Sequence, residues 1–129
     1  MRVALAATWP PRGELSRLLK LRDSLAALYE AIVIIVPPDV SSEVIQTVGS
    51  LPGVDLHVTA DWRSGKYQSL QRALRTDVEW VQYCDFDRLL HWLECFPEEL
   101  AAMLRATSAD CLILGRTERA WVTHPRCMI

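Results

Sequence analysis

The run AIVIIV, residues 31–36, indicates the fold class of this chain. All of its residues are apolar, most are β-branched, and Pro37 and Pro38 follow them directly. A short apolar run bounded by turn residues is typical of a strand that is covered on both faces. Such strands occur in parallel sheets that carry helices on each side. The run therefore predicts an α/β protein.

The segments on either side of this run alternate between strand and helix patterns. The expected strands are, in chain order, 2–8, 31–36, 54–59, 80–84 and 110–115. The expected helices are 14–29, 42–49, 65–74, one after Asp87 and one that begins at Pro97. This alternation predicts a three-layer α/β sandwich with a mostly parallel sheet. We expect one domain over residues 1–129, and the polar segment after Gly115 favours a fragment truncated from a longer domain.

The composition argues against several classes of partner. Half of the residues are hydrophobic and 23% are charged, as in ordinary globular proteins. The net charge of −2 and the scattered Lys and Arg residues predict no nucleic-acid or anionic-membrane surface. The longest apolar run is far too short for a transmembrane segment. The four cysteines lack zinc-site spacing and favour reduced core thiols, so we expect a soluble, cytoplasmic protein.

Two acidic residues, Asp85 and Asp87, flank Phe86 where the fourth strand ends and a helical pattern begins. Ligands of parallel sheets bind beyond the carboxyl ends of the strands. Alternate residues of an extended segment point the same way, so both carboxylates would face one crevice, with Phe86 turned to the core. Hard divalent cations prefer carboxylate oxygens together with substrate phosphates. The pair predicts a metal site, and a solvated acidic turn is the alternative.

This pattern resembles the donor-binding half of nucleotide-sugar glycosyltransferases with the GT-A fold, of the family 2 type. The resemblance is carried by the D-x-D that ends an apolar strand, by LLHWLE after it (89–94) and by the preceding helix GKYQSLQRAL (65–74). It covers about residues 1–117. The resemblance implies that Asp85 and Asp87 hold Mg²⁺ or Mn²⁺. It also implies transfer of a sugar from a nucleotide-diphosphate donor to a hydroxyl acceptor.

The resemblance also implies contacts with the nucleotide from the first two strands. The segment Thr8-Trp9-Pro10, after the first strand, would lie against the base. Asp39, after the second strand, would contact the base or the ribose, although this strand ends in Val-Pro-Pro-Asp and lacks the paired acids common in the family. Because tryptophans in loops can stack on a base, Trp9 and Trp62 are the candidates for that role.

Further implied contacts are basic or lie beside basic residues. Gly65 and Lys66 would sit close to the nucleotide, and Arg63 would reach the phosphates. Arg116 follows the fifth expected strand at the same end of the sheet, where a guanidinium suits bidentate contact with a phosphate. Solvated surface charges are the alternative for each of these side chains.

No other catalytic signature is present in the sequence. A G-x-S-x-G elbow, a Walker loop and a G-x-G-x-x-G after the first strand are all absent. We assign no residue as a general base, because we expect the half of a GT-A enzyme that supplies the base and the acceptor site to be missing from this chain. The alternative function is a non-catalytic α/β module, truncated or degenerate, that binds a nucleotide or a protein partner.

Overall fold

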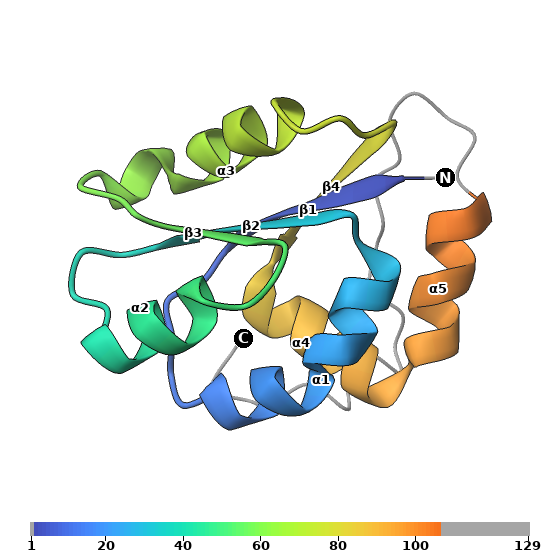
Figure 1. Cartoon of the computed structure of the whole chain (residues 1–129), viewed down its shortest axis with the longest axis horizontal. Coiled ribbons are helices and arrows are strands. Elements are labelled where there is room, and N and C mark those ends of the chain that lie inside the picture. Colours follow the sequence, from blue (N-terminus) through green and yellow to red (C-terminus); the bar gives the residue numbers. More distant parts are fainter. Residues whose placement is uncertain (1, 107–129) are drawn as a thin grey trace.

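The computed structural model describes residues 2–106, which contain one sheet of parallel strands. Its strands are β1 (Val3–Thr8), β2 (Ala31–Val36), β3 (Val54–Val58) and β4 (Trp80–Asp85). They lie in the order β3-β2-β1-β4, and neighbouring strands run parallel in all three pairs (Figure 1). The α/β class with a parallel sheet is confirmed. The fifth expected strand, 110–115, lies outside the described residues.

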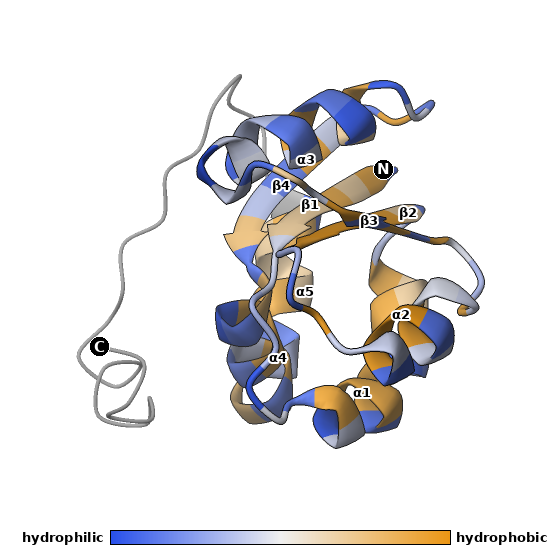
Figure 2. Cartoon of the chain, turned by 90° about the vertical axis from the view of Figure 1, so that its left-hand side faces the viewer, coloured by the Kyte–Doolittle hydropathy of each residue, from blue (hydrophilic) through white to orange (hydrophobic). Residues whose placement is uncertain are grey.

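Helices cover both faces of the sheet, which gives three layers (Figure 2). One face carries α1 (Leu15–Leu28), α2 (Ser42–Gly49), α4 (Phe86–Cys95) and α5 (Pro97–Ala106). The other face carries α3 (Gly65–Leu74), directly after the short 3-10 turn η1 (Trp62–Ser64). Of these helices, none combines the length and the apolar character that crossing a membrane requires.

Successive residues of the central strands face opposite helix layers, as the pleat of a strand requires. The larger core cluster contains, from β1 and β2, Leu5, Ala7, Ile34 and Val36. The cluster on the α3 side contains the small side chains of Ala4 and Ala6, and Ala73 of α3 packs there. Every residue of β1 is buried, and so is every residue of β2 after Ala31, so these two central strands are covered on both faces as expected. Small residues on this side allow α3 to lie close to the sheet.

Two aromatic side chains, Trp9 and Phe86, connect the segments that follow β1 and β4. Both are 0% exposed, and their ring centroids are 5.2 Å apart with planes at 54°. The backbone N–H of Trp9 donates to the carbonyl of Ile35 at 2.9 Å, which continues the strand pairing beyond Thr8. The Trp9 side chain therefore stays in the cluster of Leu5 and Ala7. The contact fixes where both segments leave the sheet.

We expect Phe86→Ala to lower the free energy of unfolding by about 3–5 kcal/mol, because it leaves a cavity against Trp9. Denaturant unfolding followed by tryptophan fluorescence measures the loss. The control is Tyr67→Ala on α3, where the side chain is 64% exposed. It should cost less than about 1 kcal/mol. Similar losses in both variants would contradict the assignment of Phe86 to the core contact.

Candidate functional site

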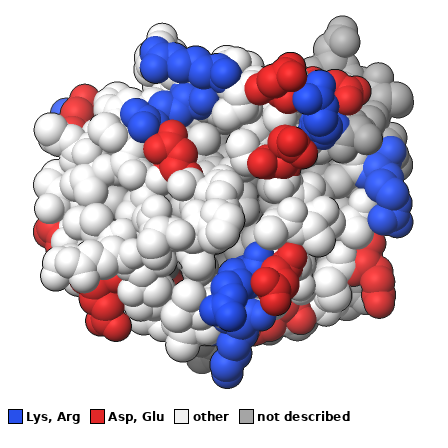
Figure 3. All heavy atoms as spheres, viewed as in Figure 1, with Lys and Arg blue, Asp and Glu red and all other residues white. Residues whose placement is uncertain are grey.

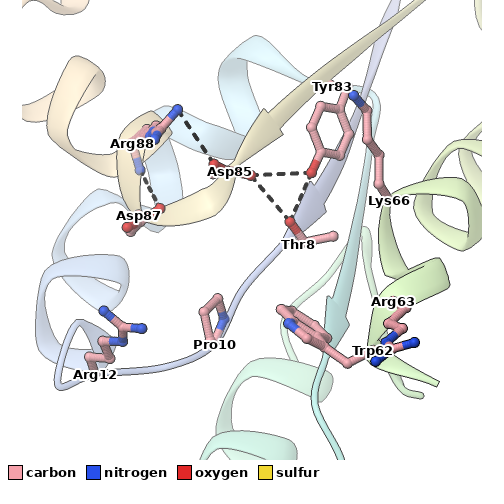
Figure 4. Close-up of a pocket in the computed structure, with 10 residues that line it drawn as sticks. All are labelled: Thr8, Pro10, Arg12, Trp62, Arg63, Lys66, Tyr83, Asp85, Asp87 and Arg88. Atoms are coloured by element: carbon pink, nitrogen blue, oxygen red, sulfur yellow. Dashed lines mark hydrogen bonds and ion pairs between the residues drawn. The ribbon is translucent and has the colours of Figure 1, made fainter. Parts of the chain in front are cut away.

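A pocket of about 410 Å³ opens at the carboxyl ends of β1 and β4. The chain places β2 and β3 on one side of β1 and β4 on the other, so the direction of winding reverses between β1 and β4. Open parallel sheets bind ligands at such a switch point. The lining residues are Thr8, Pro10, Arg12, Trp62, Arg63, Lys66, Tyr83, Asp85, Asp87 and Arg88 (Figure 4).

Three side chains form a hydrogen-bonded triangle where β1 and β4 end. Thr8 and Asp85 are paired in the register of the two strands, and Tyr83 lies two residues before Asp85 on the same face. The Thr8 and Tyr83 hydroxyls are 2.9 Å apart. Tyr83 donates to Oδ1 of Asp85 at 3.2 Å, and Thr8 lies within donating distance of the same oxygen at 3.4 Å. The two hydroxyls orient the Asp85 carboxylate.

The two aspartates line the same pocket, but not as alternate residues of an extended segment. The strand ends at Asp85 and α4 begins at Phe86, so Asp87 lies in the first helical turn. The expectation of an extended D-x-D is therefore wrong, whereas the burial of Phe86 is as expected. Asp87 Oδ1 accepts from the backbone N–H of Arg88 at 2.9 Å. An acidic residue in this turn is favourable because the N-terminal end of a helix is partially positive.

Two carboxylates are the kind of side chain that a divalent cation takes as ligands together with the oxygens of a phosphate. Mg²⁺ often takes one or two protein carboxylates and completes its coordination with substrate phosphates and water. Asp85 and Asp87 match that partial set of ligands. Within residues 2–106, no group of three or more His, Cys, Asp or Glu side chains has a metal-binding arrangement. A cation at this pair would therefore need oxygen ligands from elsewhere.

Basic side chains outnumber acidic ones in the pocket. Nη1 of Arg88 lies 3.6 Å from Oδ2 of Asp85, the only ion pair that a lining residue makes within the described part of the chain. Arg12, Arg63 and Lys66 line the pocket without a carboxylate partner among residues 2–106. On the face shown in Figure 3, by contrast, basic and acidic groups are interspersed. The positive excess is local, in a chain with a net charge of −2.

The structure brings most of the expected site residues together. Those that line the pocket are Thr8, Pro10, Arg63, Lys66, Asp85 and Asp87. Trp62, expected as a stacking residue, also lines it and is 38% exposed. Gly65 is buried beside the pocket, and a Cβ at this position would lie 3.5 Å from Cγ2 of Thr8. That is an ordinary contact distance, so the spacing alone does not require glycine there.

Two other expected residues, Trp9 and Asp39, do not line the pocket. Trp9 is fully buried, its ring N–H lies 3.5 Å from Oε1 of Glu14, and stacking on a base does not fit this placement. The reason is strand alternation, which puts Trp9 on the core side and Thr8 on the pocket side. Asp39 is exposed in the turn after β2 and does not line the pocket. Arg116 lies outside the described residues.

Three lining residues, Tyr83, Arg12 and Arg88, were not expected. Tyr83 had a signal in the sequence, because a residue two positions before Asp85 in a strand faces the same side. Nζ of Lys66 lies 4.8 Å from the centre of the Tyr83 ring, a distance that allows a cation–π contact. Arg12 comes from the loop after β1, and Arg88 from the first turn of α4. Neither arginine had a local signal.

Comparisons with known proteins bring no relative into the argument. No family model, curated protein or solved structure matches this chain. The geometry and charge of the pocket and the sequence pattern around the two aspartates are therefore the basis for assigning a function.

The ionisation of Tyr83 reports on the triangle. Burial raises the pKa of Tyr83 most; the hydrogen bond with Thr8 lowers it, and the Asp85 charge raises it further. The net direction is upward, so the phenol stays protonated at neutral pH and can donate to Asp85. We expect Asp85→Asn to lower the pKa of Tyr83, because the variant removes the negative charge.

Alkaline titration of phenolate absorbance measures this change, with the Tyr83→Phe counterpart of each protein subtracted to isolate Tyr83. The matched control is Asp87→Asn, since Asp85 and not Asp87 is among the groups that shift Tyr83. An unchanged or higher pKa in Asp85→Asn would show that the carboxylate does not interact with the phenol.

Proposed function

We propose that this chain binds a nucleotide-diphosphate sugar in the pocket between β1 and β4 and acts as a GT-A-type glycosyltransferase. One observation carries the proposal. The pocket at the switch point of the sheet contains two carboxylates, a partly exposed tryptophan and basic side chains without carboxylate partners in residues 2–106. Each of these groups suits one part of such a ligand: metal, base and phosphates.

Different residues of the pocket would contact different parts of the ligand. Asp85 and Asp87 would hold Mg²⁺ or Mn²⁺, which, when bound, offsets the charge that grows on the leaving diphosphate. Trp62 offers its ring to the base, and Thr8 and Pro10 line the pocket beside it. The sugar passes to a hydroxyl acceptor. Residues 2–106 are assigned the donor-binding role, and none of them is assigned as a catalytic base.

A second candidate is a nucleotide-binding module without turnover. It is favoured by the bonding of Asp85, whose carboxylate already has two hydroxyls and the Arg88 guanidinium around it. These groups compensate the charge of Asp85 without a metal ion. In that case the pocket would bind a nucleotide, and Mn²⁺ would not change the affinity.

Calorimetric titration of uridine diphosphate with Mn²⁺ and with EDTA separates the two candidates. If the chain is a metal-dependent transferase, Mn²⁺ tightens binding, and Asp87→Asn weakens the Mn²⁺-supported affinity by at least about tenfold, because loss of even an outer-shell partner of a metal costs about that much. The control is Asp39→Asn, an exposed acid in the turn after β2 and outside the pocket. Equal affinity with and without Mn²⁺ in the wild type would reject the metal-dependent function and favour the second candidate.

A further inference from the structure

We propose that the pocket binds phosphate groups directly through Arg12, Arg63 and Lys66, without requiring a divalent cation. The proposal rests on the proposed function only for the identity of the ligand as a nucleoside diphosphate. Its physical basis is the charge of the pocket itself. The ligand chemistry is therefore that of a diphosphate, free or attached to a nucleoside.

The unpaired basic groups favour an anion in the pocket. Four basic and two acidic residues line it, and one arginine, Arg88, is paired with Asp85. The other three cations have no carboxylate partner within residues 2–106. Like charges around one concavity repel each other, and an anion between them relieves that repulsion. Phosphate also suits guanidinium groups because it accepts two parallel hydrogen bonds.

Neither aspartate neutralises Arg12, Arg63 or Lys66, because both aspartates contact other groups. Asp85 is surrounded by Thr8, Tyr83 and Arg88, and Asp87 accepts from the backbone N–H of Arg88. Nζ of Lys66 lies over the Tyr83 ring and forms no ion pair with either aspartate. The carboxylates therefore leave this lysine available to a ligand.

The basic groups approach the pocket from two sides. Arg12 comes from the loop after β1, and Arg63 and Lys66 come from η1 and the first turn of α3, across the pocket in Figure 4. The backbone N–H of Arg12 donates to Oε2 of Glu14, which is buried and also lies near the Trp9 ring N–H. The loop that carries Arg12 is thus anchored to the core. A volume of about 410 Å³ lies within the range of small-molecule pockets.

Direct binding predicts an effect of Asp87 opposite to that of metal-dependent binding. If a cation bridges Asp87 and the phosphates, removal of the Asp87 charge weakens binding. If the phosphates bind the basic side chains directly, the same charge repels them, and its removal tightens binding. Asp87→Asn keeps the size of the side chain and an acceptor oxygen for the Arg88 N–H, so it changes mainly the charge.

The experiment is calorimetric titration of the whole chain with inorganic pyrophosphate and with uridine diphosphate, in EDTA at low ionic strength. We expect both to bind, and binding to weaken as salt is added, because the contacts are exposed and electrostatic. Arg63→Gln and Lys66→Gln should each weaken binding between about threefold and tenfold. Asp87→Asn should tighten it in EDTA. The matched control is Arg75→Gln at the opposite end of α3, which makes the same charge change and should leave the affinity unchanged.

The outcomes separate this proposal from the metal-dependent function. Binding of uridine diphosphate with Mn²⁺ but of neither ligand in EDTA would overturn direct phosphate binding and leave the function in place. Equal weakening by Arg75→Gln and Lys66→Gln would also overturn it, because only net charge would then matter. Binding in EDTA that Arg63→Gln and Lys66→Gln weaken, and that Mn²⁺ does not change, would support direct phosphate binding. It would reject a role for the metal in binding. Failure of both ligands under both conditions would overturn both proposals.

Discussion

The parallel pairing of β1 with β4 is the constraint on which the site depends. Its register places Thr8 beside Asp85, and both strands end there, so the chain must leave the sheet at two adjacent points. The Trp9–Phe86 contact holds these two exits together. One exit leads to the loop of Arg12 and the other to the first turn of α4. Without that register, the acidic and basic groups would not share one pocket.

Much of the architecture followed from local pattern. Continuous apolar runs such as 31–36 identify strands buried on both faces, and α1 ends within one residue of the expected 14–29 at each end. Parallel strands end at one edge, so Asp85 and Thr8 could be placed at the same edge of the sheet from pattern alone. The turn at Asp85 was harder, because D-x-D fits either an extended end or a helix start. Packing of Phe86 against Trp9 accompanies the helical form.

The rest of the site depends on tertiary contacts that no local pattern contains. Two exceptions follow from strand alternation, which puts Tyr83 on the same face as Asp85 and puts Trp9 on the face opposite to Thr8. Arg12 and Arg88 enter the pocket because of where a loop and a helix turn are held. Which cations keep a free charge depends on distances to carboxylates elsewhere in the chain. Sequence therefore predicts the edge of the sheet where the pocket lies better than the balance of charge in that pocket.

The alanines on one face of β1 connect the interior of the sheet with the pocket. Ala4 and Ala6 leave room for α3, and the first turn of α3 carries Lys66 into the site. A bulkier residue at either alanine would push that helix away from the sheet and widen the pocket. Evolution could thus retune which ligands fit by changing buried positions that never touch them. Related chains with identical pocket residues could differ in preference for this reason alone.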